Sequence, residues 1–374
     1  MSKSISIIII YLFTASACHA KQEEIVFDPP TSLEEAISQS TIRVEALLEE
    51  YPGLSVSVGL GDSIVWSEGF GFANTQDKEA MTSGHHLRYF SLSKSITGMA
   101  LTKLIDSGKL DIEQSVTQYL PELPAHYQPV KVKHLISHTA GIRHYNKGEW
   151  MKLSQNSCQT AAEALDVFIN DPLESIPGEV NQYSSFGYVL LSRLIEEISG
   201  LSYYGFLQAE LFTANGIEHI HMDKSADVVN EVSYYSRWRP KKQSGKVAPD
   251  VNNTCKFGGG GLVGTASDLV KLHLKMLDGG FASTANTAAY YQSFSNTKGE
   301  SVGYAFGLGS NTAKSGAPYN AHTGSGMGAN CVMMIYPESK VVVVVLGNLE
   351  GNLMNSHIGK ITKPFLELSN GIPE

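Results

Sequence analysis

Ser91 and Lys94 are the first pair of residues in this chain whose types and spacing suit catalysis. If a helix begins near Ser91, Lys94 lies one turn later on the same face, and its amine can reach the Ser91 hydroxyl. A serine hydroxyl is a weak nucleophile at neutral pH, whereas a lysine whose ammonium form is disfavoured by burial can accept its proton. The pair therefore predicts a nucleophile, Ser91, beside its base, Lys94.

The same Ser-x-x-Lys spacing recurs at Ser295 and Lys298, so the surroundings must separate the two pairs. Ser295 lies among Ser, Asn, Thr and Gly residues, which are typical of a loop that offers nothing to bury a lysine. Ser91 instead precedes an apolar-periodic run that predicts a core helix ending near Gly108: Ile96, Met99, Ala100, Leu101, Leu104 and Ile105. An N-cap serine with a solvated lysine is the structural alternative at Ser91.

A second motif, Tyr183-Ser184-Ser185, follows Pro177-Gly178 and precedes an apolar helical segment. A tyrosine at the mouth of a cleft and near a lysine can have its pKa lowered enough to act as a general base or acid. Ser185 could donate a hydrogen bond across the same site. The structural alternative is a partly buried phenol beside an N-cap serine.

A third motif, His322-Thr323-Gly324-Ser325, lies between two strand-like stretches. Glycine at this position would let a ligand approach the strand edge closely, and an N–H group of that edge could donate to an oxyanion. A glycine-rich hairpin turn with a surface histidine is the alternative interpretation of the motif.

The elements that must position these motifs fall into two groups. Strand patterns occur at both ends of the chain, whereas residues 111–254 have the pattern of helices and long loops. We therefore predict an α+β fold with a discontinuous sheet-plus-helix domain, residues 24–110 and 255–374, and a mainly helical insertion, residues 111–254. The predicted strands are 54–60, 64–69, 304–308, 331–336 and 341–346, and the predicted helices are 31–50, 130–137, 160–170, 186–199, 266–277 and 352–368.

Two of these strand predictions are specific. Gly61-Asp62-Ser63 predicts a hairpin between the first two strands. The five consecutive valines, 341–345, are long enough only for a strand, and their continuous apolar character predicts a central strand that is buried on both faces.

Composition and charge narrow the classes of partner. The 374 residues are 42% hydrophobic and 17% charged, which is ordinary for a globular protein. The formal net charge is -9, and no basic block rises above this acidic background. Nucleic acid and anionic membrane surfaces are therefore not expected as partners.

The first 20 residues have the pattern of an export signal, with Lys3, an apolar run from Ile5 to Phe13 and small residues up to Ala20. The run is too short to span a bilayer as a stable helix. We expect cleavage after Ala20 and a periplasmic or secreted protein. The alternative is a lipid anchor on Cys18, which follows an imperfect lipoprotein motif; only then would the protein be attached to a membrane.

Cysteines and histidines give no metal pattern. Cys158, Cys255 and Cys331 remain after cleavage, an odd number that permits at most one intramolecular disulfide, and whether Cys158 and Cys255 pair is open. His134 and His138 are four residues apart on an expected helix, a spacing that can hold zinc. No glutamate directly follows His134 and no third ligand is evident, which favours capping histidines of a packed helix. No metal and no cofactor are therefore expected.

Four phrases of the chain, taken in order, resemble those of the serine beta-lactamase-like hydrolases: Ser91–Thr97, Leu135–Tyr145, Tyr183–Tyr188 and His322–Gly324. This family includes class C beta-lactamases, D-alanyl-D-alanine carboxypeptidases, penicillin-binding proteins and related esterases. The resemblance covers roughly residues 30 to 365 and is strongest to the mitochondrial serine beta-lactamase-like type. It implies a beta-lactamase/transpeptidase-like fold, in which helices flank a central antiparallel sheet.

The resemblance also implies roles for single residues. Ser91 would be the acylated nucleophile, Lys94 its activating partner, and Tyr183 the group that passes a proton to the leaving group. His322 stands where many relatives have lysine, facing the Tyr183 hydroxyl. The backbone N–H groups of Ser91 and Ser325 would form the oxyanion hole.

Ser185, Thr323 and Gly324 would take part in substrate binding. Ser185 departs from the class C pattern, which has asparagine there, and this argues against strong binding of a beta-lactam side-chain carbonyl. Serine at this position matches the mitochondrial type, which resembles a peptidase that can form filaments.

These observations predict an exported serine hydrolase that forms an acyl-enzyme on Ser91. Its preferred substrate is a peptide, with hydrolysis of a beta-lactam-like small substrate or of an ester as alternatives. An inactive relative that serves as a binding or filament-forming module is the alternative of a different class, and a homo-oligomer is compatible with either.

Overall fold

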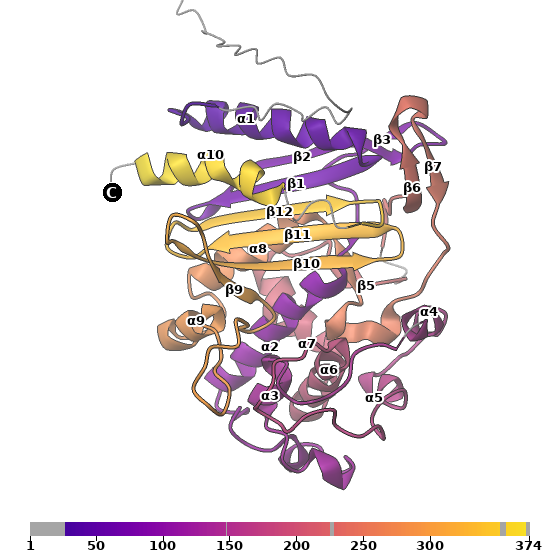
Figure 1. The fold of residues 1–374 in the computed structure, drawn as a ribbon, viewed down its shortest axis with the longest axis vertical. Helices are drawn as coiled ribbons and strands as arrows, with labels where there is room; N and C mark the ends of the chain where they lie inside the picture. Colours follow the sequence, from indigo (N-terminus) through magenta and orange to yellow (C-terminus); the bar gives the residue numbers. More distant parts are fainter. Residues whose placement is uncertain (1–26, 147, 225–227, 352–356, 372–374) are drawn as a thin grey trace, which may run out of the picture.

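A computed structural model describes residues 27–146, 148–224, 228–351 and 357–371. Its centre is a seven-stranded antiparallel sheet in the order β3-β2-β1-β12-β11-β10-β9 (Figure 1). Strand β1 pairs with β12, so strands from the two ends of the chain lie in one sheet. The strands are β1 (Gly53–Leu60), β2 (Ser63–Asn74), β3 (Glu79–Ala80), β9 (Gly309–Thr312), β10 (Pro318–Gly326), β11 (Ala329–Tyr336) and β12 (Val341–Gly347).

The predicted central strand is confirmed. β12 is the fourth of the seven strands, and all seven of its residues are buried. Alternate side chains enter two separate cores: Val341, Val343 and Val345 join one, and Val342, Val344 and Leu346 join the other. The predicted hairpin is also confirmed, because Leu60 of β1 pairs with Ser63 of β2 across a two-residue loop.

Helices cover both faces of this sheet. Helix α1 (Leu33–Ala46) and helix α10 (Ile358–Gly371) lie side by side on one face, where Trp66 of β2 stacks on Phe365 with 6.1 Å between ring centroids (Figure 1). Helix α8 (Ala266–Leu277) packs on the other face against β1, β2 and β12. α8 has the predicted bounds because the Thr265 side chain caps its first turn by accepting from the Asp268 N–H.

Helix α2 (Ser93–Asp106) lies beyond α8 in the larger core, and His273 of α8 reaches Ser95 of α2 with 3.2 Å between Nε2 and Oγ. Helix α9 (Thr284–Tyr291) contacts α2 from another side. The start of α2, which follows the predicted nucleophile Ser91, is therefore held from several directions.

The middle of the chain contains short helices and a ribbon of two strands. Helix α6 is the longest there; Ser184 caps its start and Gly200, with a φ of +71°, ends it, one residue from the predicted bounds. The predicted helices 130–137 and 160–170 are shorter in the structure, and the β6–β7 ribbon was not predicted. The elements are α3 (Val132–Ile136), α4 (Glu149–Leu153), α5 (Ala161–Leu165), α6 (Ser185–Ser199), α7 (Tyr203–Leu207), β6 (Tyr235–Arg239) and β7 (Ser244–Val247). A small three-stranded sheet joins this region to the nucleophile segment: β4 (Leu87–Arg88), β8 (Leu262–Gly264) and β5 (His221–Met222).

The prediction of a strand over residues 304–308 is wrong. This segment turns around the first turn of α2, and Gly307 has a φ of +80°. A Cβ atom at Gly307 would overlap the carbonyl group of Lys94. The strand β9 begins only after this turn. The predicted helix 352–368 lies partly outside the described residues, since residues 352–356 are not described; α10 contains Pro364 and continues to Gly371.

Cys158 and Cys255 form a disulfide, and Cys331 is a buried free thiol. The disulfide joins the segment before α5 to a 3-10 turn, Thr254–Gly259. Over the described part of the chain, no helix combines the length and apolar character that a membrane span needs. Residues 1–20, on which the export prediction depends, lie outside the described residues.

Candidate active site

Ser91 lies on a 3-10 turn, Phe90–Leu92, that leads directly into α2. Phe90 has a φ of +44°, a conformation that is strained for a residue with a side chain. Lys94 follows one turn later, and its Nζ is 3.1 Å from the Ser91 Oγ. The structure thus brings the first predicted pair into hydrogen-bond contact. Ser295, from the second Ser-x-x-Lys pair, instead lies in a loop, where it forms an isolated β-bridge with Ser301.

The surroundings of Lys94 suit the predicted role of a base. Its side chain is fully buried, and its Nζ contacts the Ser91 Oγ, the Ser185 Oγ at 3.0 Å and the Gly259 carbonyl at 2.6 Å. Burial, assisted by the neighbouring Lys256, holds the pKa of Lys94 well below its ordinary value. In the neutral form that this burial favours, the amine has two N–H groups for Gly259 and Ser185 and one lone pair that can accept the Ser91 proton.

Tyr183 lies just before α6 and donates from its hydroxyl to the Ser91 Oγ at 2.8 Å. The expected lowering of its pKa is wrong: burial raises the pKa of Tyr183 to about 12, although its hydrogen bond to Ser91 opposes this. The physical reason is that a buried lysine held neutral supplies no positive charge to stabilise a phenolate. Tyr183 is therefore a proton donor at neutral pH, at one end of a hydrogen-bonded series from Tyr183 through Ser91 to Lys94.

His322 on β10 is neutral and accepts a hydrogen bond from Tyr304, not from Tyr183. Its Nδ1 is 2.7 Å from the Thr323 carbonyl, which can only accept, so Nδ1 carries the hydrogen and Nε2 accepts from the Tyr304 hydroxyl at 2.9 Å. Burial lowers the pKa of His322 to about 3. The His322 ring lies beside Tyr183, with 6.1 Å between ring centroids, but the hydroxyl that it holds is that of Tyr304, which corrects the expectation.

The end of β10 packs against the nucleophile turn. β9 pairs with β10 only as far as Ala321, so the following residues leave one backbone edge free of strand pairing. Gly324 permits close contact, because a Cβ atom there would overlap the Tyr89 carbonyl and lie 3.1 Å from the Ser91 nitrogen. Thr323 and Ser325, on the opposite face, are exposed. Ser91 and Ser325 line one pocket, so the two residues expected to form the oxyanion hole face the same space.

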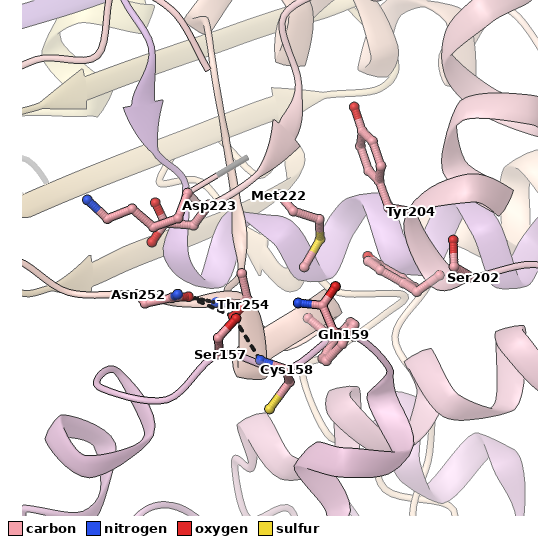
Figure 2. A pocket seen from close by; sticks show the side chains of 12 residues that line it. Ser157, Cys158, Gln159, Ser202, Tyr204, Met222, Asp223, Asn252 and Thr254 are labelled. Atoms are coloured by element: carbon pink, nitrogen blue, oxygen red, sulfur yellow. Dashed lines mark hydrogen bonds between the residues drawn. The ribbon is translucent and has the colours of Figure 1, made fainter. Parts of the chain in front are cut away.

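This pocket, called the Ser91 pocket below, has a volume of about 240 Å³. It is lined by Ser91, His144, Tyr145, Trp150, Ser185, Lys256, Ser325, Gly326 and Glu350. A second pocket lies around Cys158 (Figure 2), where Asn252 accepts from the Thr254 hydroxyl at 2.6 Å and that hydroxyl accepts from the Cys158 N–H at 3.2 Å. None of the predicted site residues lines the second pocket, so the predicted chemistry belongs to the Ser91 pocket.

Sequence reasoning missed several residues of the site. Lys256 donates to the Asn253 Oδ1 at 2.6 Å, and burial lowers the pKa of Lys256 to about 8. His144 accepts from the Ser185 N–H at 3.2 Å, and burial lowers the pKa of His144 to about 4. His144 lies in one of the four phrases that carry the family resemblance and Lys256 lies in none, and nothing in the sequence indicates that either residue faces Ser91.

The histidines considered for zinc have other contacts. His134 accepts from the Lys131 N–H at 3.1 Å at the start of α3, and His138 accepts from the Ser184 N–H at 3.2 Å. The His138 ring also packs on the Tyr183 ring, with 4.5 Å between centroids, and this contact helps to hold the phenol in place. In the residues that the structure describes, no group of three or more His, Cys, Asp or Glu side chains is arranged to hold a metal ion.

Comparison with known proteins agrees with this geometry. The family model described as beta-lactamase matches residues 43–360. The mitochondrial serine beta-lactamase-like protein LACTB of Mus musculus is 26% identical, over 84% of this chain and 77% of its own length. Penicillin-binding protein 4* of Bacillus subtilis is 25% identical, over 78% of this chain and 66% of its own.

A solved structure shows the same fold. The D-amino acid amidase of Ochrobactrum anthropi SV3, in complex with L-phenylalanine, superposes with a TM-score of 0.74 at 19% identity, covering 86% of this chain and 98% of its own. The predicted beta-lactamase/transpeptidase-like fold is thereby confirmed. The match to the family model spans most of the chain, and the chain therefore belongs to the beta-lactamase family, whose members are serine hydrolases.

Proposed function

We propose that this protein is an exported peptidase that cleaves an amide bond through an acyl-enzyme on Ser91. The observation that carries the proposal is the hydrogen-bonded series in which the Tyr183 hydroxyl donates to the Ser91 Oγ and the Lys94 Nζ lies 3.1 Å from the same oxygen. The hydroxyl of Ser91 thus lies between a proton donor and a base.

In acylation, the Ser91 Oγ attacks the carbonyl carbon of the substrate while its proton moves to Lys94. The carbonyl oxygen becomes an oxyanion, which the N–H groups of Ser91 and Ser325 stabilise; one such donor is typically worth about 2.7 to 4 kcal/mol. Tyr183 gives its proton to the leaving nitrogen as the C–N bond breaks, and the ammonium of Lys94 returns a proton to Tyr183.

In deacylation, a water molecule replaces the leaving group. It loses a proton to the same buried base and attacks the ester carbonyl, and the proton returns to the Ser91 Oγ as the ester bond breaks. Lys94 and Tyr183 therefore regain their starting protonation, and no other group has to be consumed.

Three features support the finer parts of the proposal. Ser185 provides a small hydroxyl next to Lys94 where a lactamase would offer an amide, which favours an acyclic peptide over a beta-lactam as the substrate that turns over. One relative is named as a penicillin-binding protein, which supports reaction with a beta-lactam, and ester hydrolysis stays an alternative. The Cys158–Cys255 disulfide supports export, because such bonds persist in oxidising compartments.

Labelling with an acylating probe tests the nucleophile. Intact-protein mass spectrometry after incubation with penicillin should show one adduct on the wild type and none on Ser91→Ala. Ser295→Ala, which alters the decoy motif, is the matched control and should be labelled like the wild type. An adduct that persists in Ser91→Ala would overturn the assignment.

Two further measurements test the finer parts. A chromogenic beta-lactam should give an initial burst with almost no turnover if the natural substrate is a peptide, whereas sustained turnover would indicate a lactamase. The mass of the mature protein reports its N-terminus, and an N-terminus at Met1 after expression in the source cells would contradict export.

A further inference from the structure

Lys256 is a buried cation in the Ser91 pocket without an adjacent counter-ion. Lys256 is only 6% exposed, and within the described residues its Nζ has one hydrogen-bond partner, the Asn253 Oδ1 at 2.6 Å. Among the described residues, no carboxylate lies within ion-pairing distance of this Nζ. Burying an unpaired charge is costly, so such a group persists only where the surrounding structure holds it there.

A network of buried polar groups orients Lys256. The Asp223 carboxylate accepts from the Asn253 N–H at 2.9 Å and from its side-chain amide at 2.6 Å, which turns the Asn253 Oδ1 toward Lys256. Arg88 contacts the same carboxylate at 3.5 Å, and Ser154 donates to the Asn253 Oδ1 at 3.3 Å. Asp223 is therefore already engaged, and it supports the ammonium only through Asn253.

The rest of the ammonium faces aromatic walls. The Lys256 Nζ lies 5.5 Å from the centroid of the Phe90 ring and 5.8 Å from that of Trp150, distances at which ring faces attract a cation weakly. An ammonium has three N–H groups, and only one is used by Asn253. The other charged side chain that lines the pocket, Glu350, is exposed and so is screened by solvent.

The position of Tyr183 decides which part of a substrate meets Lys256. In the proposed mechanism Tyr183 protonates the leaving group, so the leaving group lies on the Tyr183 side of Ser91. Lys256 and Trp150 line the Ser91 pocket, whereas Tyr183 and His322 do not. The Ser91 pocket therefore receives the other half of the substrate, the acyl group that stays attached to the Ser91 Oγ.

We propose that Lys256 is a specificity residue that binds a carboxylate carried by the acyl group of the substrate, close to the carbonyl that Ser91 attacks. This inference rests on the proposed function. It is distinct from it, since Ser91 can be acylated by a neutral group whether or not Lys256 selects an anionic one.

Boronic acids test the two claims separately, because the Ser91 hydroxyl adds to trigonal boron and the carbon substituent on boron then occupies the acyl position. We would measure the dissociation constants of 3-carboxyphenylboronic acid and of 3-carbamoylphenylboronic acid, which differ in charge and little in shape. Wild-type protein should bind the carboxylate about tenfold to hundredfold more tightly, as expected for hydrogen bonds to charged groups. In Lys256→Met this preference should vanish, while the carbamoyl compound should still bind.

Lys152→Met is the matched control, because Lys152 lies on α4 next to this pocket but is exposed and does not line it. It should keep the preference. Equal binding of both compounds by the wild type, or an unchanged preference in Lys256→Met, would overturn the assignment of Lys256. If neither compound binds the wild type, the proposed role of Ser91 fails instead. If Lys256→Met does not fold, which a loss of cooperative thermal unfolding would show, the relative affinity of the wild type for the two boronic acids still tests the proposal.

Discussion

Replacing Gly324 with alanine tests the geometry on which the proposed oxyanion hole depends. A Cβ atom at this position would overlap the Tyr89 carbonyl and lie only 2.5 Å from the Cys331 sulfur and 3.1 Å from the Ser91 nitrogen. Non-bonded heavy atoms need about 3.5 Å, so the strand β10 would have to move away from the Ser91 turn by about 1 Å. The N–H group of Ser325 would then leave hydrogen-bond range of an oxyanion that the Ser91 N–H still contacts.

The expected loss follows from that displacement. Removing one oxyanion donor costs about 2.7 to 4 kcal/mol, so kcat should fall by roughly 10² to 10³. We would measure kcat and KM on a chromogenic substrate together with the temperature of thermal unfolding. Because Tyr89 contributes a backbone carbonyl, which cannot be shortened, adding Cys331→Ala to Gly324→Ala should restore little activity.

Gly187→Ala is the matched control. Gly187 lies inside α6, and a Cβ atom there would be 3.6 Å from the nearest atom, the Leu135 carbonyl oxygen, which is an ordinary contact. Alanine is also the better helix former, so this variant should keep full activity. A folded Gly324→Ala protein with the wild-type kcat would refute the assignment of Ser325 as an oxyanion donor.

Three further predictions concern the base, the proton donor and the disulfide. The acylation rate of Ser91 should rise with pH through the pKa of Lys94, because protonation below that pKa removes the lone pair that accepts the Ser91 proton. Lys94→Met should be unreactive at every pH. Stopped-flow measurement of acylation at several pH values checks both expectations, and a rate that does not change with pH would contradict the role of Lys94. Tyr183→Phe should slow acylation roughly 10²- to 10⁴-fold when the substrate is an amide. The loss should be much smaller when the substrate is an aryl ester, because a phenolate leaves without a proton. Equal losses on the two substrates would count against proton donation by Tyr183. Replacing both Cys158 and Cys255 with serine opens a loop closed over a sequence separation of 97. In the chain-entropy model this lowers the free energy of unfolding by up to about 4.7 kcal/mol, which urea denaturation measures. A denaturation midpoint equal to that of the wild type would show that the disulfide does not constrain the chain.

The sequence predicted those parts of the fold that local pattern determines. Five consecutive valines suit only a strand with both faces buried, and the helix predicted over residues 266–277 has the bounds of α8. The segment 304–308 was misassigned because its apolar residues pack in the core around α2. These contacts join parts of the chain that are far apart in sequence, such as Gly307 and Lys94. Local pattern cannot distinguish a buried turn from a short strand.

For the site, the sequence supplied the reacting groups but not their electrostatics. The pKa of Tyr183 was expected to fall, and it rises, because the depth of burial depends on residues such as His138 that lie far from it in sequence. Lys256 was missed for a similar reason. Its aromatic walls come from Phe90 and Trp150, and only the folded chain brings these rings to one lysine.

The pairing of β1 with β12 has a consequence for the timing of activity. Ser91 and Lys94 are synthesised early, but the strand β10, which carries Ser325, is synthesised near the end and enters the sheet between β9 and β11. If Ser325 supplies an oxyanion donor as proposed, an unfinished chain would have its nucleophile without a complete oxyanion hole. On the proposed mechanism, a proteolytic cut that releases the last strands should therefore abolish activity while leaving Ser91 intact.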